Sequence, residues 1–169
     1  MAGEAGHIRL AEDGPVGYGK AGSFEGFCSG GGIAQLGQVM AEEALDREEI
    51  PSFCQSKGEL FKVNARTIAE AAEKGDPLAL KIYDIVADRL GQGLAILVDL
   101  LNPEKIVIGS IFLRQEKLLR TRMEKILNKE ALEHSLSVVE VVPAGLGEKL
   151  GDYAAVSVGL RAYQKKQER

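Results

Sequence analysis

Apolar residues recur every three or four positions through the middle of the chain, and this period predicts one long helix. The helix is expected to begin after Asp76, whose carboxylate can accept first-turn N–H groups, with Pro77 at the first position, where no backbone N–H is needed. Asn102 and Pro103 are expected to end it. Its apolar positions form one continuous face, made of Ile82, Val86, Leu90, Leu94, Leu97 and Leu101.

Four further stretches are expected to be helical because of their apolar periodicity and their capping residues. They are residues 24–45 after Ser23, residues 65–74 between Asn64 and Gly75, residues 115–132, and residues 153–167 after Asp152. Three short runs predict strands, at residues 6–10, 105–108 and 136–142. The second of these runs is rich in β-branched residues and is expected to be a buried parallel strand. Helices alternating with parallel strands predict an α/β fold in which helices outnumber strands.

Composition and charge narrow the class of protein. Of the 169 residues, 45% are hydrophobic and 27% are charged, which suits a single domain with its own core. The net charge of −4 gives no basic surface, so no direct nucleic-acid binding is expected. The apolar runs are too short to span a bilayer, and the first residues do not resemble a signal peptide. With two cysteines and no disulfide framework, a cytoplasmic protein is expected.

Glycine is the unusual residue in the composition, with 20 in the chain. Residues 17–22 (GYGKAG) have the spacing of a dinucleotide-binding loop, but they follow a turn at residues 13–15 and no buried strand precedes them. A tight loop is therefore the favoured interpretation. Cys28 would need a base beside it to act as a nucleophile, and although His7 is conceivable, no spacing supports it. A buried structural cysteine is favoured instead.

Two sets of residues are candidates for ligand contact. Glu4, His7 and Glu25 lie in glycine-flanked segments, and two carboxylates with an imidazole can hydrogen-bond several sugar hydroxyls at once. Gly109 and Ser110 follow the second predicted strand, where ligands of α/β proteins bind and where a glycine lets a phosphate or base approach the backbone. The alternatives are ordinary exposed side chains for the first set and a simple turn for the second.

An ordered series of motifs runs through these segments. Residues 2–8 (AGEAGHI) resemble the AGExGHI segment of the ROK family (repressors, open reading frames and kinases). The remaining motifs resemble, in order, the family's GCxE…SG segment, its long helix with the following strand, and its last helix. They are residues 22–25 (GSFE) with 29–30 (SG), residues 75–77 (GDP), 90–94 (LGQGL) and 101–109 (LNPEKIVIG), and residues 150–155 (LGDYAA).

This resemblance implies an actin-like, ribonuclease-H-like fold, with residues 1–169 forming a single domain, the helix-rich carboxy-terminal lobe with a small sheet. Enzymes of the family transfer the γ-phosphate of ATP, with magnesium, to a hexose-type sugar, and its repressors keep the sugar site and add a helix-turn-helix. Glu4, His7 and Glu25 match family positions that hydrogen-bond the sugar. Gly109 matches the first glycine of the turn against the nucleotide, and Ser110 replaces the family's usual second glycine.

The chain departs from the family pattern at the structural zinc. The resemblance implies that His7 and three cysteines would hold this metal, but the cysteine positions contain Val16, Tyr18 and Ser23. Valine and tyrosine do not replace thiolates on zinc, so no zinc is expected. Packing of Tyr18 and Phe24 is expected to hold the loop instead.

The resemblance also implies that the amino-terminal lobe is absent, together with its DxGxT phosphate loop, the general-base aspartate and the opening strands of the second lobe. The chain is then a cut piece, a truncated reading frame or one chain of a split protein, and is expected to be inactive alone. A small sheet with an exposed edge predicts a homodimer. Three functions stay open: a lobe of a sugar kinase, the sugar-sensing lobe of a repressor, or a non-catalytic sugar-binding or oligomerisation module.

Overall fold

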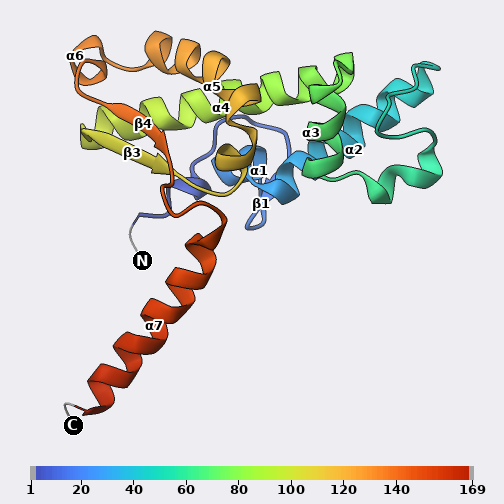
Figure 1. Cartoon of the computed structure of the whole chain (residues 1–169). Coiled ribbons are helices and arrows are strands. Elements are labelled where there is room, and N and C mark those ends of the chain that lie inside the picture. The colour runs from blue at the N-terminus through green and yellow to red at the C-terminus, as the bar shows by residue number, and fades with distance from the viewer. Residues whose placement is uncertain (1–2, 168–169) are drawn as a thin grey trace.

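The computed structural model of the chain describes residues 3–167, and its largest part is a body of four helices (Figure 1). They are α2 (Gly30–Asp46), α3 (Ala65–Glu73), α4 (Pro77–Leu101) and α5 (Ile111–Glu130). Helix α4 is the central element, because α2, α3 and α5 all pack against it. Its core-facing side chains, at most 2% exposed, include Ile82, Val86, Leu94 and Val98. The apolar period of this helix therefore marks the core of the protein.

Side-chain caps confirm three predicted helix starts. Ser23 Oγ accepts the Gly26 N–H at 3.0 Å, and Asp76 Oδ1 accepts the Ala79 N–H at 2.9 Å. Asn64 caps α3 in the same way, at its N2 and N3 amides. The stretch predicted as one helix over residues 24–45 is divided, because its backbone is extended at the residue that joins α1 (Phe24–Cys28) to α2.

Strands β3 (Lys105–Ile108) and β4 (Glu140–Pro143) form a two-stranded parallel sheet, which confirms that the two predicted runs pair in parallel. The expectation that the first of them is buried is wrong. Its side chains alternate between half-buried and exposed, and Val107 is 59% exposed, because no layer of the described chain covers the outer face. The second run was predicted to begin at residue 136, but α6 (Glu133–Leu136) occupies its start.

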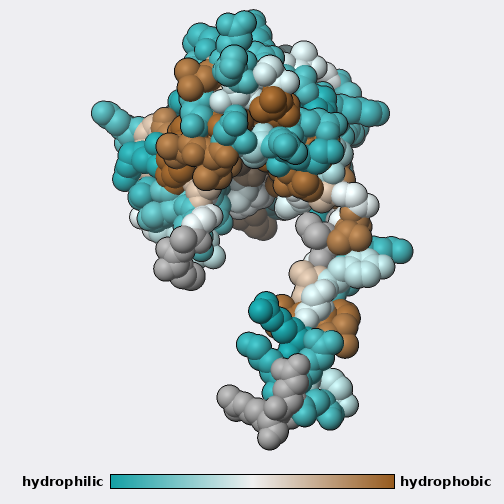
Figure 2. Space-filling model, turned by 90° about the vertical axis from the view of Figure 1, so that its left-hand side faces the viewer, coloured by the Kyte–Doolittle hydropathy of each residue, from teal (hydrophilic) through white to brown (hydrophobic). Residues whose placement is uncertain are grey.

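Two helix boundaries also differ from the prediction. Helix α5 begins at Ile111, before the expected residue 115, because its first turn precedes a kink at Gln115, where φ is −119°. Residue 152 lies inside the first turn of α7 (Leu150–Gln167) and does not cap it. Helix α7 extends away from the body (Figure 1). Exposed hydrophobic side chains lie along it (Figure 2), among them Val156, Val158 and Leu160.

The glycine-rich front of the chain folds into short elements. These are η1 (Ala5–His7), β1 (Val16–Gly17), β2 (Lys20–Ala21) and α1. The strand predicted at residues 6–10 is wrong, because a 3₁₀ turn occupies its start and only Arg9 makes an isolated bridge to the chain beyond β2. The short helices η2 (Lys57–Lys62) and η3 (Gly147–Lys149) complete the connections. No helix in the described part of the chain combines the length and the hydropathy needed to cross a membrane.

Polar contacts hold the loop around Tyr18, and the prediction that this tyrosine packs there is wrong. Tyr18 is 84% exposed and has a positive φ of 46°. The loop is tied to α2 by Gln35, whose Oε1 accepts the Val16 N–H at 2.9 Å and whose Nε2 donates to the Val16 carbonyl at 3.1 Å. Phe24 reaches α4, where a Cβ on Gly93 would lie 2.5 Å from its ring. Phe24 therefore joins the front of the chain to the helical body.

Candidate functional site

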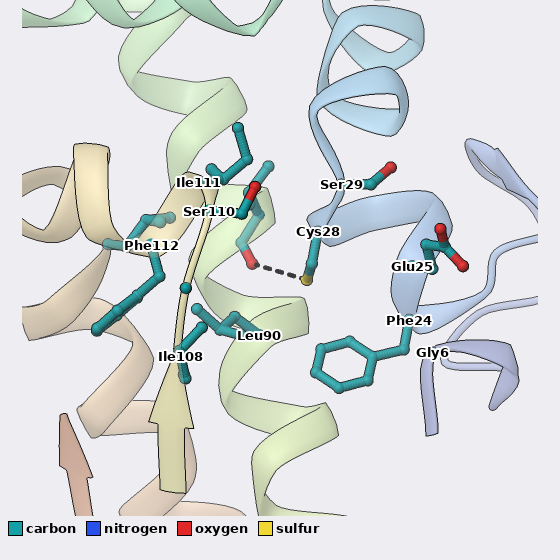
Figure 3. A pocket seen from close by; sticks show the side chains of 13 residues that line it. Gly6, Phe24, Glu25, Cys28, Ser29, Leu90, Ile108, Ser110, Ile111 and Phe112 are labelled. Atoms are coloured by element: carbon teal, nitrogen blue, oxygen red, sulfur yellow. Dashed lines mark hydrogen bonds between the residues drawn. The ribbon is translucent and has the colours of Figure 1, made fainter. Parts of the chain in front are cut away.

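A cavity of about 300 Å³ lies between α1, α4 and the end of β3 (Figure 3). Glu25 of α1 lines one side of it, and Gly109 and Ser110 line the opposite side. The backbone of Gly6 in η1 completes the rim next to Glu25. The fold therefore brings Glu25 from the first predicted set and both residues of the second set to one cavity, although Glu25 and Gly109 are far apart in sequence.

Local backbone packing sets the position of Glu25. The cap by Ser23 starts α1 so that Glu25 lies in the first turn, and it is half-buried. Gly26 fits because a Cβ there would press into the Pro15 carbonyl. On the other side, a Cβ on Gly6 would lie 3.5 Å from Glu25 Oε2. The carboxylate thus rests against the η1 turn, with the cavity in front of it.

Glu4 and His7 lie at the two ends of that same turn. Both are exposed, and neither lines the cavity. The His7 carbonyl accepts a hydrogen bond from Lys20 Nζ at 2.8 Å, which ties the turn to β2. Glu25 therefore lies beside the turn that carries Glu4 and His7. The convergence of all three polar groups on a sugar stays a prediction.

The turn after β3 has the backbone geometry of a close approach. Ser110 adopts φ 54° and ψ −119°, a region that glycine enters readily and that strains a residue with a side chain. Its side chain makes no capping hydrogen bond to α5, so the first N–H groups of this helix are not capped by it. A phosphate or nucleotide fits beside such a turn, because these N–H groups are donors for an anion. The residues present are therefore compatible with nucleotide contact.

Most of the cavity wall is apolar, and sequence reasoning assigned no ligand role to this part. Glu25 is the one charged residue among the described residues that line it, and the polar side chains beside it are Ser29 and Ser110. Hydrophobic side chains make the floor: Phe24, Val86, Leu90, Ile108, Ile111, Phe112 and Leu119. The position of Ser29 before a glycine run is the sequence feature that could have identified it, since serine often caps a helix. In the structure its Oγ accepts the Gly32 N–H at 3.1 Å and caps α2.

Cys28 also lines the cavity, with its sulfur directed at α4 (Figure 3). Its Sγ lies 4.0 Å from the Val86 carbonyl oxygen. Burial raises the pKa of the Cys28 thiol well above its ordinary value, and the nearby Arg89 offsets only part of this effect. The thiol is therefore protonated at neutral pH, which disfavours the nucleophile hypothesis for this residue.

The donor set at the family's zinc position does not fit a zinc ion. Val16 and Tyr18 provide no thiolate, and the hydroxyl of Ser23 is engaged by the Gly26 N–H. Within residues 3–167, no three His, Cys, Asp or Glu side chains come together in a group that could hold a metal ion.

The family of this chain follows from its sequence match over this whole fold. The model of the ROK family matches residues 1–159. The chain belongs to the ROK family. Its curated relatives include transcriptional regulators and glucokinases. The DNA-binding transcriptional dual regulator NagC of Escherichia coli is 30% identical over 159 residues, which is 91% of this chain and 36% of the relative. The glucokinase of Streptomyces coelicolor is 28% identical over 153 residues, which is 89% of this chain and 48% of the relative.

Solved ROK structures divide in the same way. A ROK family glucokinase from Streptomyces griseus in complex with glucose and AMPPNP superimposes with a TM-score of 0.67 and 26% identity, over 88% of this chain and 48% of that one. A ROK family transcriptional regulator superimposes with a TM-score of 0.67 and 25% identity, over 84% of this chain and 34% of that one. The fold is that of the actin-like sugar kinases. The chain spans between about a third and a half of the length of these relatives.

Proposed function

We propose that this chain is the sugar- and nucleotide-contacting lobe of an ATP-dependent hexose kinase and does not catalyse the reaction alone. The observation that carries the proposal is the shared cavity, with the Glu25 carboxylate on one side and the Gly109–Ser110 turn on the other. A kinase needs a sugar hydroxyl and a nucleotide phosphate next to each other, and these two groups suit those two ligands. The match to a glucokinase solved with glucose and AMPPNP supports the same assignment.

In this proposal each residue contributes binding and orientation. Glu25 accepts hydrogen bonds from sugar hydroxyls, and Glu4 and His7 supply further polar contacts from the adjacent turn. The backbone at Gly109 and Ser110 contacts the nucleotide. The ATP and magnesium supply the phosphoryl group and its charge neutralisation when bound. The general base would come from polypeptide outside the residues described here, which is the reason that the chain alone is expected to be inactive.

The test supplies the polypeptide that the chain lacks relative to its kinase relatives. This chain would be produced together with the part of the Streptomyces coelicolor glucokinase that it does not match, and the purified complex would be assayed for ATP-dependent glucose phosphorylation in a host without hexokinases. We expect activity from the complex and none from the chain alone. Glu25→Gln should lower the affinity for glucose at least about tenfold, the loss of one charged hydrogen bond.

The matched control is Glu12→Gln. Glu12 is an exposed carboxylate in the same front segment and does not line the cavity, so its replacement should leave the affinity for glucose unchanged. Equal glucose affinity in the Glu25→Gln and wild-type complexes would contradict the sugar-contacting role of Glu25. Phosphorylation of glucose by the isolated chain would contradict the proposal that the chain does not catalyse the reaction alone.

A second candidate is the sugar-sensing lobe of a repressor, and one observation favours it. NagC is 30% identical over 91% of this chain and a ROK family transcriptional regulator superimposes with a TM-score of 0.67, so a repressor matches the chain as well as the glucokinases do. A sensor needs the sugar contacts but no phosphoryl transfer. Binding of N-acetylglucosamine or glucose by the complex, without ATP hydrolysis or sugar phosphorylation, would favour this candidate over the kinase.

A further inference from the structure

One side chain holds the η1 turn, which carries Glu4 and His7, to the hairpin of β1 and β2. Lys20 of β2 donates from Nζ to the His7 carbonyl at 2.8 Å, across a separation of 13 residues. Lys20 is half-buried, and among the residues that the structure describes this carbonyl is the one partner of its ammonium. A hydrogen bond from a charged donor is stronger than one between neutral groups.

The hairpin is itself held to the helical body. Gln35 of α2 accepts the Val16 N–H and donates to the Val16 carbonyl, so one side chain bonds both backbone groups of this residue. Strand β1 pairs with β2, with Gly17 opposite Lys20. A continuous series of contacts therefore runs from α2 through the hairpin and Lys20 to the η1 turn.

The η1 turn lies against the start of α1. A Cβ on Gly6 would lie 3.2 Å from the Glu25 Cβ, and Figure 3 shows these two residues next to each other. The Phe24 N–H donates to the Ile8 carbonyl at 2.8 Å and joins the end of the turn to the first residue of α1. A displacement of η1 would therefore move the two polar residues that it carries relative to the Glu25 carboxylate.

A zinc ion at the position that the family resemblance implies would connect the same segments by other means. Its ligands would be the His7 ring and the side chains at positions 16, 18 and 23, so it would join the turn to the hairpin. Val16 and Tyr18 cannot replace thiolates on zinc. The Ser23 hydroxyl already accepts the Gly26 N–H. The donor set does not fit the metal, whereas a lysine ammonium already reaches the same histidine from the hairpin.

We propose that Lys20 is a positioning residue of the sugar site, and that its ammonium takes the place of a structural metal by holding η1 next to Glu25. The role in sugar binding rests on the proposed function, whereas the role in holding the turn does not. Within residues 3–167, His7 forms hydrogen bonds through its backbone only. A metal would occupy one ring nitrogen, but a bond to the carbonyl leaves both ring nitrogens open to sugar hydroxyls.

The first test measures the turn in the chain alone. The Ile8 N–H donates to the Ala5 carbonyl at 3.0 Å and closes η1, so the hydrogen exchange of this amide, followed by NMR, reports whether the turn is formed. Lys20→Met removes the ammonium and keeps an unbranched side chain, and Lys20→Arg keeps a cationic donor. We expect the Ile8 amide to exchange at least about threefold faster in Lys20→Met and near the wild-type rate in Lys20→Arg.

Lys117→Met is the matched control, because Lys117 is an exposed lysine of α5 and its replacement removes the same charge. It should leave the exchange of the Ile8 amide unchanged. The amide of Val86, in the buried face of α4, should keep its protection in every variant, which separates loosening of η1 from unfolding of the chain. Equal exchange of the Ile8 amide in Lys20→Met and the wild type would overturn the proposal. A change in this exchange on adding zinc or EDTA to the wild type would assign the connection to a metal and also overturn it.

The second test measures the sugar site in the complex with the unmatched part of the Streptomyces coelicolor glucokinase. Lys20→Met should raise the KM for glucose at least about threefold and leave the KM for ATP unchanged, because the turn carries sugar-contacting residues only. Lys20→Arg should keep the wild-type KM for glucose. A role in stability alone would lower the active fraction, and with it kcat, without changing either KM. An unchanged KM for glucose in Lys20→Met would therefore overturn the positioning role.

A combined variant shows whether Lys20 acts through the residues of the turn. In a chain that carries Glu4→Gln and His7→Ala, Lys20→Met should have no further effect on the KM for glucose, because the contacts that it positions are gone. The same threefold effect in that chain would overturn the positioning role. A complex that binds no glucose would overturn the proposed function and the sugar role of Lys20 together. The exchange of the Ile8 amide would still decide whether Lys20 holds the turn.

Discussion

The helical body buries its apolar residues, whereas the side of the lobe that carries β3 and α7, here called the open side, leaves apolar residues exposed. In the body, α2, α3 and α5 cover the apolar face of α4, and Ile82 and Val98 have no exposed surface. On the open side, Val107 of β3 is 59% exposed and Leu160 of α7 is 56% exposed. A helix as long as α7 is marginal in water when nothing packs on it. Stability of the chain should therefore come from the body, and the open side should be the region that gains most from a partner.

The largest predicted change in the free energy of unfolding distinguishes the helical body from the open side. Ile82→Ala in the body removes a side chain with 0% exposure and should lower the free energy of unfolding by about 4 kcal/mol, because it leaves a cavity. Leu160→Ala on α7 should change it by less than about 0.5 kcal/mol. Urea unfolding monitored by circular dichroism would measure both. A comparable loss of stability in Leu160→Ala would show that α7 is covered in solution and would contradict the contrast between the body and the open side.

The junction of α1 and α2 tests how tightly the body holds the site. A Cβ on Gly32 would overlap the Gly26 carbonyl oxygen, whereas a Cβ on Gly31 meets nothing within 4 Å. Gly32→Ala should therefore cost about 3 kcal/mol and displace α1. Gly31→Ala should stabilise the chain by about 0.5–1 kcal/mol, because alanine is the better helix former. Thermal unfolding of the two variants provides the measurement, and equal melting temperatures would contradict the close packing of this junction.

The cap of α4 makes the stability of the body depend on pH. Burial acts to raise the pKa of Asp76, but the hydrogen bonds donated by the Ala79 and Ser52 N–H groups outweigh it and hold the pKa below its ordinary value. A lowered pKa in the folded state means that the contribution is present above the unfolded pKa and is lost as the pH falls through the folded pKa.

Asp76→Asn should therefore narrow the stability difference between pH 7 and pH 3. Asp76→Ala should cost about 1 kcal/mol at pH 7, the usual contribution of a cap. Urea unfolding at both pH values measures these effects. A wild-type chain and an Asp76→Asn variant with the same dependence on pH would exclude the cap as its source.

The smallest change in the free energy of unfolding is expected for Tyr18, in the loop in front of the body. Tyr18→Ala should change the free energy of unfolding by less than about 0.5 kcal/mol, because Tyr18 is 84% exposed. Gln35→Ala should cost about 1–2 kcal/mol, since it removes both hydrogen bonds that tie Val16 to α2. The same unfolding measurement applies to the pair. A larger loss of stability in Tyr18→Ala than in Gln35→Ala would show that the tyrosine, and not Gln35, holds the loop.

Local chemistry predicted the elements that depend on neighbouring residues. The caps at Ser23, Asn64 and Asp76 lie where their side chains predicted them, because each bonds to an amide within three residues. The predicted strand at residues 6–10 failed for the converse reason. Its alternating pattern also suits a turn whose bonds and packing come from distant segments, and the Phe24 N–H donates to the Ile8 carbonyl at 2.8 Å.

The sequence by itself determined the family and most of the helices, because motifs and periodicity are local properties of the chain. Only the tertiary structure decided that Glu25 lies across one cavity from the Gly109–Ser110 turn, and that the floor of this cavity is apolar. Helix α4 packs against both α1 and α5, so its burial fixes the distance between segments far apart in sequence. No pattern within a single segment contains that information, because the packing free energy belongs to the pair of surfaces in contact.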